Sequence, residues 1–107
     1  MPTTITVMYE NVDDATFDLD YYLSKHMPLV GEKFARFGIT GWRVVKAVGT
    51  PTGEKPLYSI IATLEFETAQ QFKDAVAAEG GPVFGDVPNF SNKSPVVVIS
   101  DVVGNSP

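Results

Sequence analysis

The sequence contains no cysteine and only one histidine, His26. Without thiols the chain can form no disulfide framework, no thiol nucleophile and no thiolate metal site. One imidazole alone is also a poor ligand set for zinc, so we expect no metal. Basic residues are few as well, because eight Lys and Arg stand against 13 Asp and Glu and give a net charge of −5. Such a surface repels phosphate backbones, which argues against a nucleic-acid partner.

Long apolar runs are missing too. No stretch approaches the roughly 20 residues that cross a bilayer. The N-terminus, Met-Pro-Thr-Thr-Ile-Thr-Val, lacks the basic and apolar regions of a signal peptide. We therefore expect a cytoplasmic protein without membrane contact. With 107 residues, 44% of them hydrophobic, the chain predicts one soluble domain over residues 1–107, with a frayed tail at 104–107.

Hydrophobic spacing predicts the element order β-α-β-β-α-β. This order is typical of the ferredoxin-like fold, an α+β architecture in which one four-stranded antiparallel sheet carries both helices on one face. Right-handed crossovers place the first and third strands at the centre of the sheet. The expected strands are 3–9, 41–48, 57–66 and 95–103, and the expected helical regions are 18–37 and 68–79.

Prolines and glycines indicate where the helices break. Pro28 disfavours helical geometry at the residue before it, so we expect two helical pieces with a kink at His26–Met27. The second helix opens with a capping box, in which Thr68 and Gln71 satisfy each other's backbone N–H groups. We expect it to end before Gly80 and to be followed by a loop that reaches residue 93.

The strands also predict how the chain assembles. A sheet covered on one face alternates apolar and polar side chains, but residues 95–99 are apolar without alternation. The helices can cover only one face, so the simplest cover for the other is a second copy, packed sheet against sheet. The alternative is a partly exposed apolar sheet. We therefore predict a homodimer that forms through the sheet face.

Two stretches resemble the EthD family, named for ethyl tert-butyl ether degradation. Residues 17–30 (FDLDYYLSKHMPLV) are similar to the family's signature, and 85–92 (GDVPNFSN), followed by the strand at 95–102, to its Asp-x-Pro-Asn-aromatic loop. The resemblance implies a ferredoxin-like protomer, a dimeric α/β barrel and a pocket between sheet and helices. The EthD family belongs to the dimeric α/β-barrel superfamily, whose members include cofactor-independent monooxygenases, cyclases, lactone isomerases and haem-binding enzymes.

His26 is the candidate catalytic residue, because imidazole is the side chain that exchanges a proton near neutral pH. Tyr22 lies one turn earlier on the same helix face, where its phenol could hold the imidazole tautomer or bind a substrate oxygen. Asp86, in the loop before the last strand, could orient the ring. The alternative is that His26 bonds to a carbonyl and locks the kink, while Asp86 serves only the turn.

Substrate contacts are expected from the same loop and from aromatic side chains. Asn89 could donate a hydrogen bond to a carbonyl or enolate oxygen, and Trp42 is the most plausible wall of an apolar pocket. The alternative is that the aromatic residues belong to the ordinary core or to the dimer interface. The predicted substrate-binding residues are Asn89, Trp42, Phe84, Phe90 and Tyr9.

Missing motifs narrow the chemistry. There is no Gly-x-Gly-x-x-Gly fingerprint, so the reductase label carried by some EthD relatives has no dinucleotide motif to support it. We expect no cofactor, although haem stays open because one axial histidine would suffice. The sequence favours a cofactor-independent enzyme that isomerises, cyclises or oxygenates a small hydrophobic carbonyl or phenolic molecule. The alternative is a non-catalytic small-molecule-binding or stress-associated dimer.

Overall fold

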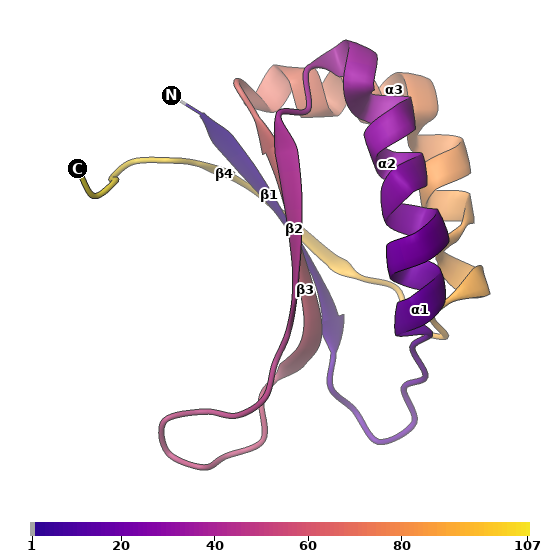
Figure 1. Ribbon diagram of the computed structural model, residues 1–107, viewed down its shortest axis with the longest axis vertical. Coiled ribbons are helices and arrows are strands. Elements are labelled where there is room, and N and C mark those ends of the chain that lie inside the picture. Colours follow the sequence, from indigo (N-terminus) through magenta and orange to yellow (C-terminus); the bar gives the residue numbers. More distant parts are fainter. Residues whose placement is uncertain (1) are drawn as a thin grey trace.

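One antiparallel sheet with helices on a single face makes up the protein, as the computed structural model shows for residues 2–107 (Figure 1). The strand order is β2-β3-β1-β4, so β1 and β3 are central and the predicted α+β ferredoxin-like fold is confirmed. The strands are β1 (Thr3–Glu10), β2 (Gly41–Lys46), β3 (Tyr58–Phe66) and β4 (Val96–Asp101). The helical elements are α1 (Leu19–Tyr21), η1 (Tyr22–His26), α2 (Met27–Phe34), η2 (Ala35–Phe37), α3 (Ala69–Gly85) and η3 (Val87–Asn89).

The core lies between the helices and the inner face of the sheet. Alternation along β3 buries Ile60, Ala62, Leu64 and Phe66, as the period of two requires. Aromatic rings mark both ends of this core. At one end Phe34, Phe66 and Phe72 pack together, with Phe72 edge to face against the other two rings. At the other end lie Tyr9, Phe17, Tyr22, His26 and Phe90.

The first helical region stays helical from Leu19 to Phe37, so the predicted gap between two helical pieces is absent, although a new piece, α2, does begin at Met27 as the predicted position of the kink requires. Instead, residues 22–26 form a π-helical turn in which the Met27 N–H bonds to the Tyr22 carbonyl. His26 (φ −70°, ψ −50°) and Met27 (φ −66°, ψ −39°) both keep right-handed helical geometry. Pro28 lies in the first turn of α2, where its missing N–H costs least. A π turn, like a proline, is a feature at which helices commonly bend.

Helix α3 begins as predicted and ends later than predicted. The capping box between Thr68 and Gln71 is present. The helix continues through Gly80, Gly81 and Pro82 to Gly85, because neither central glycine adopts a positive φ. Gly80 is buried, and a Cβ there would approach Val76 to 3.1 Å, so this glycine permits close packing and does not end the helix. Neither α3 nor any other helix within residues 2–107 is long and apolar enough to cross a membrane.

Strand β4 is an edge strand of the sheet, and α3 contacts it. Its apolar side chains, Val96, Val97, Val98 and Ile99, are each 37–41% exposed. Because successive side chains of a strand point to opposite faces, β4 presents apolar, partly exposed side chains on both faces of the sheet. Residues 102–107 continue beyond it without regular structure.

Candidate functional site

His26 and Asp86 form a hydrogen-bonded pair between the first helical region and the segment after α3. The His26 Nδ1 atom lies 2.9 Å from Asp86 Oδ2, and the side chains are only 6% and 11% exposed. The last residue of the π turn carries the imidazole, and the residue that caps α3 carries the carboxylate. The predicted contact between His26 and a polar group of the 85–92 segment is therefore present.

Asp86 is itself held by further donors. Its Oδ1 atom accepts hydrogen bonds from the Tyr21 hydroxyl at 2.7 Å and from Asn89 Nδ2 at 2.9 Å. Burial raises the pKa of Asp86, but the hydrogen bonds from Tyr21, Asn89 and His26 outweigh it and leave the pKa below its ordinary value. Asp86 is therefore a carboxylate near neutral pH. The hydrogen bond between Tyr21 and Asp86 in turn raises the pKa of the Tyr21 phenol.

The ionised carboxylate determines the tautomer of the histidine. A carboxylate only accepts hydrogen bonds, so the Nδ1 atom of His26 must carry the hydrogen. In the neutral ring the lone pair then lies on Nε2. His26 thus has the orientation of a general base whose second nitrogen is held by a carboxylate, an arrangement that many unrelated enzymes use.

Aromatic rings enclose the imidazole. Tyr22 stacks on it with ring centroids 5.2 Å apart and planes 15° apart, and Phe90 lies 4.5 Å away. Burial raises the pKa of Tyr22 to about 12, and burial together with Tyr22 raises the pKa of Tyr9 further above its usual range. Both phenols therefore stay neutral, so Tyr22 packs against the histidine and is not itself a base.

An apolar cavity of about 30 Å³ lies beside the ring, between the helices and the sheet. That volume holds one or two water molecules, so the site as it stands accommodates neither a drug-sized ligand nor a haem. The lining residues are Val7, Tyr9, Tyr22, His26, Met27, Val30, Phe34, Ala62, Leu64, Phe72, Val83, Phe84, Val87, Pro95 and Val97.

The predicted substrate-binding residues are only partly brought together. Tyr9 and Phe84 line the cavity, and Phe90 contacts His26 directly. Asn89 donates to Asp86 and does not line the cavity. Trp42 is also absent from the lining, because it lies on the edge strand β2 with 43% of its surface exposed, near Gly31 of α2. The prediction that Trp42 forms the pocket wall is therefore wrong for this cavity.

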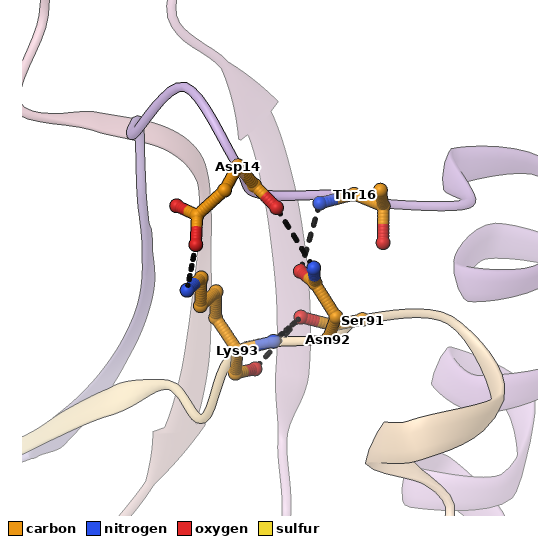
Figure 2. Close-up of polar contacts among 5 residues, drawn as sticks. All are labelled: Asp14, Thr16, Ser91, Asn92 and Lys93. Atoms are coloured by element: carbon orange, nitrogen blue, oxygen red, sulfur yellow. Dashed lines mark hydrogen bonds and ion pairs between the residues drawn. The ribbon is translucent and has the colours of Figure 1, made fainter.

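Two loops that flank the site are joined by polar contacts (Figure 2). Asn92 accepts from the Thr16 N–H and donates to the Asp14 carbonyl, both at 2.8 Å. Lys93 pairs with the Asp14 carboxylate at 2.7 Å, and Ser91 forms a β-bridge with Phe17. These contacts attach the chain entering α1 to the segment that follows Asp86.

Sequence reasoning missed two residues of this arrangement. Tyr21 is not among the predicted site residues, yet it donates to Asp86. Asn92 had no assigned role, although an asparagine amide can imitate a strand pairing by donating and accepting at once. Within residues 2–107, no three His, Asp or Glu side chains converge in a way that could hold a metal ion.

Comparison with known proteins identifies relatives of this fold. The chain is similar to the crystal structure of an EthD-like protein from Ralstonia eutropha, with 28% identity, a TM-score of 0.88 and coverage of 98% of this chain and 95% of that one. An EthD family protein from Bacillus halodurans shares 20% identity at a TM-score of 0.75, covering 96% of this chain and 100% of that one. SnoaB from Streptomyces nogalater, a cofactor-independent oxygenase, shares the fold at 12% identity and a TM-score of 0.57, over 99% and 96% of the two chains. No protein-family model matches the sequence, and no curated protein does.

Proposed function

From the premise that this chain is an EthD-like protein with a ferredoxin-like fold, we propose that it is a cofactor-independent enzyme with His26 as its general base and acid. Its substrate is a small hydrophobic molecule that contains a carbonyl or phenol group. The observation that carries the proposal is the Nδ1 hydrogen bond to Asp86 in a ring that also lines the apolar cavity.

The proton transfer follows from the tautomer. Nε2 of the neutral ring takes a proton from a carbon next to the substrate carbonyl, or from a phenol, and the electron pair of the broken bond moves to the substrate oxygen. The imidazolium that results is stabilised by the Asp86 carboxylate at Nδ1. Returning the proton to a different carbon isomerises the substrate, and attack of the carbanion on a second carbonyl closes a ring. Oxygenation would need molecular oxygen as co-substrate.

The apolar surroundings support this role. A site lined by aliphatic and aromatic side chains excludes water, which strengthens the interaction between imidazolium and carboxylate. SnoaB, a cofactor-independent oxygenase, shares this fold at 12% identity, and a shared fold does not establish a shared reaction. The proposal therefore rests on the site and not on the relative.

A second candidate is a non-catalytic small-molecule-binding protein. The small cavity favours it, and so does Asn89, whose amide donates to Asp86 and does not line the cavity. In that case the His26–Asp86 pair would only join the first helical region to the end of α3.

We also propose that the protein is a homodimer through the outer face of the sheet. Val96, Met8, Ile61 and Val45 are successive cross-strand neighbours and form one apolar row across all four strands. No helix lies against this face (Figure 1). An apolar row on a bare sheet face is the surface that a second copy would cover.

Deuterium exchange tests the catalytic proposal without knowledge of the natural substrate. A panel of 1,3-dicarbonyl and phenolic compounds is incubated with the protein in D₂O, and label at carbon is followed by mass spectrometry. We expect protein-dependent exchange that falls on the order of 10²-fold in His26→Gln. Exchange that persists in His26→Gln would contradict the role of the imidazole. Binding of panel members without any exchange would favour the second candidate.

A further inference from the structure

Two hollows meet at the end of α3. Beside the His26 cavity lies a surface groove of about 320 Å³, lined by Phe84, Val87, Pro88, Ser94, Pro95 and Val97. Four of these residues, Phe84, Val87, Pro95 and Val97, also line the cavity. The same side chains therefore face the cavity on one side and the groove on the other.

Exposure separates this side of the cavity from the rest of its wall. Phe84 and Val97 are 39% and 38% exposed, and Val87 and Pro95 are partly buried. The only other lining residue that is not buried is Val7, which pairs with Val97 across β1 and β4. All remaining lining residues are buried. The wall is therefore thinnest where the groove adjoins it.

We propose that this groove is the mouth of the His26 cavity, and that it holds the outer part of the ligand while Phe84 and Val97 determine what can pass. The inference rests on the proposed function, since it takes the His26 cavity as the ligand site. The groove supplies the volume for a ligand that the cavity alone lacks. About 320 Å³ lies within the range of small-molecule sites, whereas about 30 Å³ does not.

The lining of the groove indicates the class of ligand. It contains no charged side chain, and Ser94 is its only polar one. A charged group would lose its hydration there without a partner. The ligand is therefore uncharged and apolar along its outer part, and a planar ring would pack against Phe84. Its polar reacting group points inward, toward His26.

The end of α3 is able to adapt to a ligand. Gly81 and Gly85 have open space where a Cβ would stand, so no packing requires glycine at either position. Each glycine weakens a helix by roughly 1 kcal/mol relative to alanine. Pro82 removes a further backbone hydrogen bond inside the helix. The last turns, which carry Val83 and Phe84, are thus held mainly by side-chain packing.

Titration with 1-naphthol, an uncharged planar phenol, tests the proposal by NMR. We expect shifts of the Phe84, Val87 and Val97 amides and of the His26 ring. Val97→Trp should fill the groove and weaken binding by on the order of tenfold or more. Ile99→Trp is the matched control, because Ile99 lies two residues further along the same face of β4 and lines neither hollow. Equal binding by the two variants, or shifts confined to other surfaces, would overturn the proposal.

A second pair of variants avoids β4 in case the tryptophans disturb it. Phe84→Glu places a carboxylate in the mouth and should exclude the probe, whereas Ala77→Glu, on an exposed turn of α3, should not. If Phe84→Glu binds like the wild type, the groove is not the mouth. These measurements are independent of catalysis. A protein that binds 1-naphthol in the groove but catalyses no exchange contradicts the proposed function alone, and exchange without groove binding contradicts the mouth alone.

Discussion

His26 and Asp86 lie 60 residues apart in the sequence and meet through a 2.9 Å hydrogen bond between Nδ1 and Oδ2. The pair joins the π turn to the cap of α3, the two segments that border the apolar cavity. Because the pKa of Asp86 is lowered, its carboxylate is ionised near neutral pH. A negative charge therefore stands beside the imidazole that would act as the base. One contact therefore sets the orientation, the tautomer and the charge balance of the site.

Replacing Asp86 by asparagine should change the tautomer of His26 while keeping the shape of the site. An amide can either donate to or accept from Nδ1, so the Nδ1–H form loses its preference. Since the chain has one histidine, a long-range ¹H–¹⁵N spectrum reports a single ring. We expect the Nδ1–H tautomer in the wild type and a mixture in Asp86→Asn, with exchange activity reduced by roughly 10²- to 10⁴-fold. An unchanged ring spectrum would show that Asp86 does not control the tautomer.

The same carboxylate should make stability depend on pH. Its pKa is lower in the folded protein than in the unfolded chain, so its contribution is present above the unfolded pKa and is lost as pH falls through the folded one. We expect the free energy of unfolding to fall between about pH 5 and pH 2, and to fall less in Asp86→Asn. Urea denaturation at several pH values measures both proteins. Parallel curves would contradict the prediction.

The fold could be predicted because its signals are local and periodic. Alternation along β3, the capping box at Thr68 and the apolar spacing of Met27, Val30 and Phe34 all appear in the structure as expected. The end of α3 could not be predicted, because glycine occurs both at helix ends and at positions of close packing. Only the neighbours of Gly80 show which of the two applies.

The sequence predicted most of the residues that form the site and one of the contacts between them, but not the other contacts. His26 and Asp86 do pair, but Tyr22 stacks on the ring, and Tyr21 is the tyrosine that reaches the carboxylate. Residues five apart lie on different faces of an α-helix. The π turn inserts one residue and brings Tyr21 and His26 to the same partner. Helical spacing therefore predicted that Tyr22 lies beside His26, but not that Tyr21 reaches Asp86.

Removing the Asn92 amide should destabilise the protein and increase the mobility of the His26 ring. Its two hydrogen bonds attach residues 14 and 16 to the segment after Asp86 (Figure 2). Asn92→Ala should lower the free energy of unfolding by about 1–2 kcal/mol and broaden the His26 ring signals, because the helix start and Asp86 lose their common support. Lys93→Met, which removes only the exposed ion pair with Asp14, is the control and should cost less than about 1 kcal/mol. Equal effects of the two changes would contradict the role of the amide.

The outer face of the sheet should hold two copies together. Ile61 lies in the central strand β3, in the apolar row that Val96, Met8 and Val45 complete. Light scattering should give a mass near twice 11.6 kDa for the wild type. Ile61→Glu puts a carboxylate in each copy at the middle of the contact, where the two charges would be desolvated against apolar side chains and would repel each other. We expect this variant to be a folded monomer, because its own helices pack on the opposite face.

Val48→Glu, at a side chain that is 96% exposed beyond the end of β2, should stay dimeric. A monomeric wild type would contradict the dimer, and a dimeric Ile61→Glu would place its interface elsewhere, with the edge strand β4 as the next surface to substitute.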